Sequence, residues 1–167
     1  MKTEVIYGNI VKQPDADAVV NSANANLRLG SGVAGAIHKA AGPDLEAFCQ
    51  PFAPLGLGRT LISPGFKLPN PWVIHVCAAS YINHDEAETI LEDALEAMMA
   101  VAQKHGIRSL AMPAIGTGVF KFPPALAAQI TAEVLKRHAS PNGSVQWVRI
   151  CVANPEMLEV YTAALQS

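Results

Sequence analysis

Residues 19–24 read VVNSAN and residues 30–35 read GSGVAG, and these two runs decide the predicted fold. The first is an apolar strand that ends in polar residues, and the second opens a helix with glycines. Backbone N–H groups at the start of a helix have no intrahelical partner and lie at the positive end of the helix dipole. The segment therefore predicts a binding site for a phosphate or a diphosphate.

The composition limits what can surround this segment. The chain has 167 residues, of which 50% are hydrophobic and 16% are charged, and its formal net charge is -2. These values predict one compact domain over residues 1–167 and exclude a disordered chain or a general binder of nucleic-acid backbone. Because no apolar run is long enough for a membrane span and no basic leader is present, we expect a soluble, cytoplasmic monomer without membrane partners.

Short apolar runs alternate with helix-length segments, which is typical of an α/β sheet layered with helices. The predicted strands are Glu4–Tyr7, Ala18–Asn21, Arg59–Ser63, Trp72–Val76, Ser109–Met112 and Val145–Val152. The predicted helices are Val33–Ala41 with a continuation at Asp44–Cys49, Asp85–His105, Pro123–Arg137 and Pro155–Leu165. In the longest helix we expect Asp85 as the N-cap and Gly106 as the stop.

The run GSGVAG fits the GxGxxG pattern of dinucleotide-binding Rossmann turns, but its surroundings do not. A Rossmann turn follows its strand directly, whereas here residues 21–29 intervene. The acidic residue expected about 20 positions later, at the end of a second strand, is also missing, because Asp44 and Glu46 fall in a predicted helix. A Rossmann site is therefore disfavoured, and a turn that binds no ligand stays as the alternative to a phosphate site.

A second glycine-bearing loop, Pro113–Phe120, also follows a predicted strand and precedes a predicted helix. Two such loops at strand ends could clamp a diphosphate with main-chain N–H groups while Phe120 covers the sugar, and an ordinary connection is the alternative. Asn21 and Asn24 lie at the C-terminal end of the predicted strand Ala18–Asn21 and could grip vicinal hydroxyls of a ribose, although asparagine is also a common turn former.

No residue pattern in the chain indicates a metal, a nucleophile or a pair of catalytic acids. The five histidines lack the spacing of a metal-binding helix, and the sequence contains no Walker loop and no GxSxG elbow. His75 lies in an apolar strand and is interpreted as a hydrogen-bonded core residue, and the three cysteines as reduced core residues. We expect no cofactor and no metal, so any catalysis would have to use the ligand's own groups.

Taken in order, five motifs resemble those of the macrodomain family of ADP-ribose-binding proteins, over nearly the whole chain. Gly8–Ile10 resembles the family motif GDI, and Val20–Asn24 resembles VNAAN. Gly30–Gly42 resembles GGGVxxAIxxAAG, and Ser63–Pro69 together with Val73–His75 resembles TPGYxLPxxxVIH. Pro113–Phe120 resembles PxISTGxY/F. The resemblance implies a three-layer α/β/α macrodomain fold with a mixed central sheet and an ADP-ribose cleft at one sheet edge. Some members hydrolyse mono-ADP-ribose from acidic side chains or deacetylate O-acetyl-ADP-ribose, and others only bind.

The same resemblance implies the site residues. Asn24 is similar to the family's asparagine that holds the distal ribose beside the scissile bond, and it is expected to be catalytic. The residues expected to bind the ligand are Asn9, Ile10, Ser22, Asn24, Gly30, Gly32, Val33, Ala34, Thr117, Gly118, Val119, Phe120, Ala153 and Asn154. Phe120 is expected on the distal ribose and Ile10 near the adenine. The implied partner is ADP-ribose or an ADP-ribosylated macromolecule.

Four positions depart from the family pattern. Ala34 replaces the aspartate of the GVDG loop and cannot orient a water, so the substrate's phosphate would have to hold it. Asn9 replaces an aspartate and Ala153 replaces an aromatic residue, which predicts a weakened adenine end. Lys121 replaces a glycine and adds a cation near the second phosphate loop.

Two hypotheses follow from these residues. One is an ADP-ribosyl hydrolase or O-acetyl-ADP-ribose deacetylase, supported by Asn24 and both phosphate loops. The other is a non-catalytic reader of ADP-ribose or a related nucleotide, supported by Ala34 and the altered adenine pocket.

Overall fold

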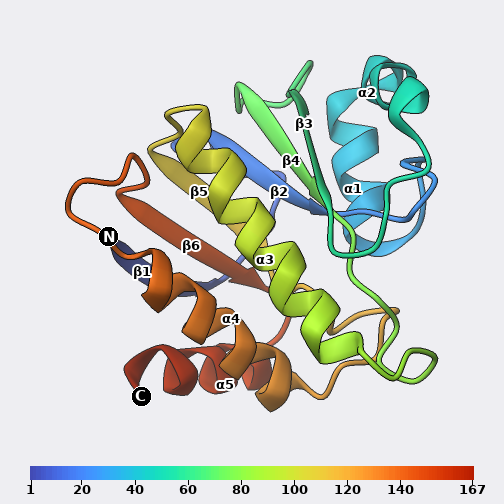
Figure 1. Ribbon diagram of the computed structural model, residues 1–167. Coiled ribbons are helices and arrows are strands. Elements are labelled where there is room, and N and C mark those ends of the chain that lie inside the picture. Colours follow the sequence, from blue (N-terminus) through green and yellow to red (C-terminus); the bar gives the residue numbers. More distant parts are fainter.

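The computed structural model describes all 167 residues and contains one six-stranded sheet (Figure 1). The strands are β1 (Lys2–Tyr7), β2 (Ala18–Ser22), β3 (Thr60–Pro64), β4 (Trp72–Val76), β5 (Ser109–Pro113) and β6 (Trp147–Val152). Their order across the sheet is β1-β6-β5-β2-β4-β3. All neighbours are parallel except β3, which runs antiparallel to β4 at the edge, so the sheet is mixed as expected.

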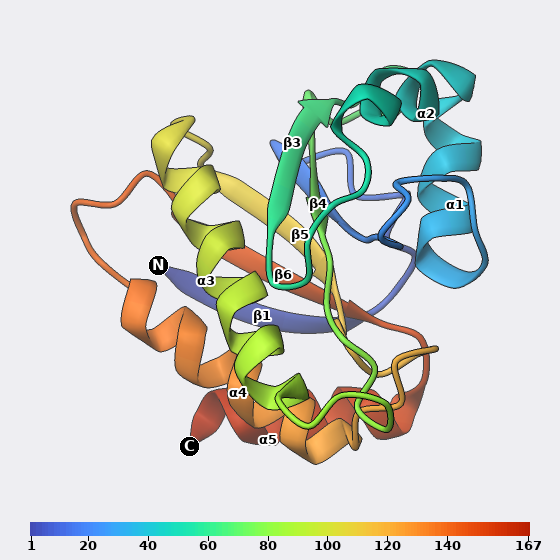
Figure 2. The same ribbon diagram turned by 45° about the vertical axis from the view of Figure 1, so that its right-hand side comes forward.

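Helices cover both faces of this sheet (Figures 1 and 2). They are α1 (Gly32–Ala41), α2 (Pro43–Cys49), the short 3₁₀ helix η1 (Gln50–Phe52), α3 (Ala87–Lys104), α4 (Pro124–His138) and α5 (Pro155–Gln166). Helices α1 and α2 lie on one face, and α3, α4 and α5 lie on the other. The predicted three-layer α/β/α fold is therefore confirmed.

The strands are apolar because both of their faces are covered. In β2, Ala18 and Val20 belong to a core cluster of 29 residues that includes side chains of α3, α4 and α5. Val19, which points to the opposite face, belongs to a second cluster of 15 residues with side chains of α1 and α2. Burial on two faces explains why the parallel strands read as continuous apolar runs.

The long helix α3 differs in one detail from its prediction. It begins at Ala87, with Glu86 at the N-cap position and no side-chain capping bond, so the expectation that Asp85 caps the helix was wrong. Its end was predicted correctly, because Gly106 follows it with a φ of 66° and its N–H donates to the Gln103 carbonyl. A left-handed residue at this point suits glycine best.

Parallel strands bring the segments that follow them to one edge of the sheet. The segments after β2, β5 and β6 therefore come together, although they are far apart in the sequence. Ligands collect at this edge in open α/β sheets. None of the helices combines the length and the apolar character that crossing a membrane requires.

Candidate functional site

A cleft of about 520 Å³ lies at this edge of the sheet. The end of β2 and the start of α1 form one wall, the loop between β5 and α4 forms the second, and the end of β6 with the first turns of α5 forms the third. Three segments thus enclose one space, although 80 positions separate Val33 from Pro113 and 27 positions separate Pro124 from Cys151.

Nine of the residues predicted for the site line this cleft. They are Ser22, Gly32, Val33, Thr117, Gly118, Val119, Phe120, Ala153 and Asn154. Five further predicted residues lie outside the lining, namely Asn9, Ile10, Asn24, Gly30 and Ala34. The structure therefore brings the two glycine loops together in one cleft, and five of the expected site residues do not line it.

The first wall is an open helix start. The N–H groups of Gly32, Val33 and Ala34 have no hydrogen-bond acceptor in the protein, the N-cap residue Ser31 makes no capping bond, and the first turn holds no acidic side chain. A Cβ on Gly35 would come within 2.4 Å of the Gly30 carbonyl oxygen, so only glycine allows this turn to close. The positive end of α1 is thus available to an anion.

The second wall supplies further free donors. In the loop after β5, the N–H groups of Gly118, Val119 and Phe120 have no partner in the protein. Two hydrogen bonds hold the loop in place. The Tyr81 N–H donates to the Phe120 carbonyl at 2.7 Å, and the Thr117 hydroxyl donates to the Ala114 carbonyl at 2.7 Å. Unpartnered main-chain N–H groups of this kind suit an anion, as those at the start of α1 do.

The cleft contains no cationic side chain. Its only ionisable lining residues are Cys151 and Glu156. Burial raises the pKa of the Cys151 thiol to about 11, which keeps it protonated and unreactive at neutral pH. An anion in this cleft would therefore be held by main-chain N–H groups, and no lining side chain is poised as a thiolate nucleophile.

Asn24 is not among the lining residues, and it holds the loop that leads to the glycines. Its Nδ2 donates to the Arg28 carbonyl at 2.8 Å, and its Oδ1 accepts from the Arg28 N–H at 3.1 Å. Glu46 of α2 supports the same loop, because its Oε2 accepts from the Leu29 N–H at 2.7 Å. Two side chains from different elements therefore fix the approach to Gly30.

Asn21 does not share a ribose with Asn24, and that expectation was wrong. Asn21 is only 1% exposed, and its Nδ2 donates to Nδ1 of His75 at 3.1 Å. The alternation of side chains along a strand places Asn21 on the buried face, beneath α1 and α2, rather than in the cleft. The Asn21 amide therefore makes its hydrogen bond inside the core.

His75 is confirmed as a hydrogen-bonded core residue. It is fully buried, and Nε2 lies 2.9 Å from the Ser63 hydroxyl oxygen while Nδ1 faces the Asn21 amide. Because Asn21 donates to Nδ1, the neutral ring carries its proton on Nε2 and donates to Ser63, whose hydroxyl donates on to the Pro64 carbonyl. Burial, and to a lesser extent His38, lowers the pKa of His75 to about 3.

This buried ring predicts a pH dependence of stability. Between pH 6.5 and about 3 the unfolded chain binds a proton at His75 that the folded chain does not bind. The stabilising contribution is complete above pH 6.5 and is lost as the pH falls, with a slope of at most about 1.4 kcal/mol per pH unit. Urea denaturation of the wild type and of His75→Gln at pH 7 and pH 5 measures this loss of stability. An equal change in unfolding free energy between the two pH values in both proteins would contradict the buried, neutral state of His75.

The remaining predicted residues occupy the third wall and the neighbouring loop. Asn154 is the N-cap of α5, where its Oδ1 accepts from the Met157 N–H at 2.9 Å. Asn9 is exposed, and its Oδ1 accepts from the Val11 N–H at 3.1 Å, while Ile10 is 7% exposed in the smaller core cluster. Both residues lie in the loop between β1 and β2.

Nine lining residues were not among the predicted site residues. Four of them belong to the third wall, namely Cys151, Glu156, Met157 and Val160, and the others are Ser31, Pro113, Ala114, Gly116 and Pro124. A signal for this wall existed, because Asn154 followed by a proline marks a helix start directly after a strand. That signal places a third helix N-terminus at the same sheet edge as the other two walls.

Comparisons with known proteins agree on one family. A family model described as Macro domain matches residues 20–131. A protein of Pantoea vagans named O-acetyl-ADP-ribose deacetylase 1 is 34% identical over 170 residues, which cover 98% of this chain and 98% of that protein.

Solved structures give the same result. The Oceanobacillus iheyensis macrodomain with ADP superposes with a TM-score of 0.92 at 28% identity and covers 98% of this chain and 90% of its own. The Trypanosoma brucei macrodomain in complex with ADP-ribose superposes with a TM-score of 0.90 at 25% identity, and the match covers 98% of this chain and 68% of that one.

Proposed function

This chain belongs to the Macro domain family, and we propose that it binds ADP-ribose in the cleft and hydrolyses ester linkages at the distal ribose. One observation carries the proposal. Two sets of unpartnered N–H groups, at the start of α1 and in the loop after β5, line a cleft without any cationic side chain. Such a cleft suits a diphosphate with neutral groups on both sides.

The placement of the ligand follows from the walls. The diphosphate would lie between the N–H groups of Gly32–Ala34 and those of Gly118–Phe120. The distal ribose would lie against Phe120, on the side of the loop fixed by Asn24. The adenosine would extend toward Ala153 and Asn154, with Asn9 and Ile10 beside the base. The ring of Phe120, partly buried and packed against the larger core cluster, supports the ribose contact.

The reaction needs no side-chain base. A water held by a phosphate oxygen of the substrate would attack the carbonyl carbon of the ester, passing a proton to that phosphate oxygen as the new C–O bond forms. The bond between the acyl carbon and the ribose oxygen breaks, the ribose oxygen takes the proton back from the phosphate, and the products are ADP-ribose and a carboxylic acid. Donors that bind the developing charge more strongly than the ground state would supply the rate.

Cys151 provides a test of this mechanism. Since its thiol stays protonated at neutral pH, we expect Cys151→Ala to retain turnover within about threefold of the wild type. Steady-state release of ADP-ribose from O-acetyl-ADP-ribose measures the effect. A loss of two orders of magnitude at unchanged thermal stability would instead assign the thiol a covalent role.

Calorimetry with ADP-ribose tests the binding step alone. We expect micromolar affinity for the wild type, which corresponds to about 8 kcal/mol of binding free energy. The absence of measurable heat or competition at millimolar ligand would contradict the proposal. A monomeric state and a cytoplasmic location, expected from the sequence, stay predictions.

A second candidate function is a reader that binds ADP-ribose without turnover. It is favoured by α1, whose first turn contains no acidic residue that could orient a water. This function predicts micromolar binding together with no release of ADP-ribose above the uncatalysed rate. Single-turnover measurement on one ester substrate separates the two functions directly.

A further inference from the structure

The loop between β1 and β2, residues 8–17, leaves the sheet beside the cleft. The Gly8 N–H donates to the Val152 carbonyl at 3.2 Å, and Val152 immediately precedes Ala153 of the cleft lining. The next two residues, Asn9 and Ile10, are those proposed for the adenine. The conformation of this loop therefore sets where its base-recognising groups lie.

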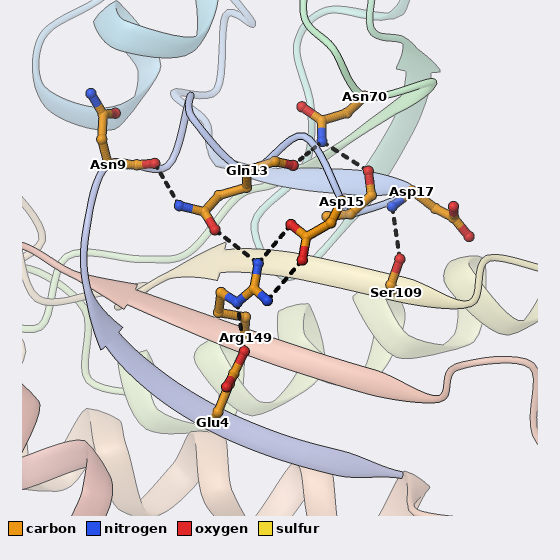
Figure 3. Close-up of polar contacts among 9 residues, drawn as sticks. Glu4, Asn9, Gln13, Asp15, Asp17, Asn70, Ser109 and Arg149 are labelled. Carbon is orange, nitrogen blue, oxygen red and sulfur yellow. Dashed lines mark hydrogen bonds and ion pairs between the residues drawn. The ribbon is translucent and has the colours of Figure 1, made fainter.

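Arg149 of β6 anchors the loop from outside the cleft (Figure 3). Its Nη1 and Nη2 donate to the two carboxylate oxygens of Asp15 at 2.8 and 2.9 Å, and Nη1 also donates to Oε1 of Gln13 at 3.0 Å. On the other side its Nε donates to Glu4 of β1 at 2.6 Å. Only 17% of the Arg149 side chain is exposed, whereas 56% of the Asp15 side chain is, so the planar, bidentate contact has a largely buried guanidinium and a carboxylate open to water.

Gln13 connects Arg149 to Asn9 by hydrogen bonds. While its Oε1 accepts from Arg149, its Nε2 donates to the Asn9 carbonyl at 2.9 Å, and the residue is 6% exposed. The Gln13 carbonyl is held as well, because it accepts from Nδ2 of the buried Asn70 at 2.7 Å (Figure 3). A continuous chain of hydrogen bonds thus joins a guanidinium on β6 to the backbone of Asn9.

We propose that Arg149 is a positioning residue for base recognition, which holds Asn9 at the adenine end of the cleft through Gln13 and Asp15. The proposal rests on the proposed binding of ADP-ribose. Asn9 is a neutral acceptor, so it lacks the charge that strengthens a hydrogen bond to the adenine amino group. A loop that is already ordered loses less conformational entropy on binding, and this compensates for the weaker contact.

Two variants test the role of Arg149, and a third is the matched control. Arg149→Lys keeps the positive charge but loses the bidentate contact with Asp15 and the reach to Gln13. Gln13→Met keeps the side-chain length and removes the hydrogen bonds from Arg149 and to the Asn9 carbonyl, while the contact between Arg149 and Asp15 stays. Glu4→Gln breaks the other ion pair of Arg149 without touching the loop. Calorimetric affinities are measured for ADP-ribose and for its analogue in which hypoxanthine replaces adenine.

We expect the wild type and Glu4→Gln to prefer ADP-ribose over the hypoxanthine analogue about tenfold, and both test variants to reduce this preference to about twofold or less. The affinity for the analogue changes little. Hydrogen exchange at the amides of Val11 and Lys12 is expected to accelerate in the test variants only.

Three results would overturn the assignment of Arg149. They are a wild type that binds ADP-ribose without base preference, an undiminished preference in both test variants, and an equal loss in Glu4→Gln. A wild type that binds neither nucleotide would remove the proposed function, and the positioning role with it. Because these results differ in the wild type's own affinities, failure of the inference and failure of the proposed function are distinguishable.

Discussion

Replacing Gly118 by valine is expected to weaken ADP-ribose binding by about a hundredfold or more while leaving the fold intact. A Cβ at this position meets no protein atom within 4 Å, so the added side chain has open space and does not disturb the core. Because Gly118 lines the cleft, we expect the valine side chain to occupy part of it. There it would displace the diphosphate from the N–H groups of the loop. Losing two hydrogen bonds to a charged group at about 1.5–3 kcal/mol each corresponds to two orders of magnitude or more.

The graded variant Gly118→Ala is the control for this prediction. Its smaller side chain should weaken binding less than valine does, and both variants should unfold at the wild-type temperature within about 2 °C. Calorimetry and thermal denaturation measure the two quantities. Wild-type affinity in a folded Gly118→Val protein would place the diphosphate elsewhere.

Replacing Asn24 by alanine is expected to reduce turnover by about two orders of magnitude, a larger effect than its effect on affinity. The side chain makes two hydrogen bonds to the backbone of Arg28, and the loop that it holds leads into Gly30 and the start of α1. Losing them should cost about 1–2 kcal/mol of stability and misalign the donors beside the distal ribose. Single-turnover rates, corrected for the folded fraction, measure the loss.

Glu46→Ala separates the two ways in which Asn24 could act. It removes the other anchor of the same loop, the acceptor for the Leu29 N–H, without changing Asn24. If Asn24 contacts the substrate, Glu46→Ala loses much less turnover than Asn24→Ala. Equal losses in the two variants would show that Asn24 acts only by holding the loop.

The order of elements and the two anion-binding loops could be predicted because their signals are local. Glycines at 30, 32 and 35 require a turn and an open helix start, and Gly106 ends a helix whose apolar face repeats at helical spacing. The prediction at Asp85 failed for a reason that is not local. The helix starts two residues later, at Ala87, whose side chain is buried in the larger core cluster, so tertiary packing decided the helix start.

What the sequence could not show depends on contacts between distant residues. Whether Asn21 faces the cleft or the core depends on its strand's neighbours, and the structure pairs it with His75 54 positions away. The link from Arg149 to Gln13 spans 136 positions, and no spacing rule predicts it. The third cleft wall required knowing that β6 lies beside β5.

The absence of a cationic side chain from the cleft lining has a consequence for the salt dependence of binding. Main-chain N–H groups bind a diphosphate through direction and distance rather than net charge, so their contribution is less sensitive to salt than that of a lysine or arginine cluster. The two ionisable lining residues, Cys151 and Glu156, supply no positive charge. Diphosphate binding would therefore use N–H groups that are already unpartnered in the folded chain.

Single-turnover release of ADP-ribose from O-acetyl-ADP-ribose, measured with enzyme in excess, decides whether the cleft hydrolyses esters. We expect release by the wild type well above the uncatalysed rate, and release at the uncatalysed rate by Gly118→Val. A folded wild type that binds ADP-ribose yet releases none above background would contradict hydrolysis and leave the reader function.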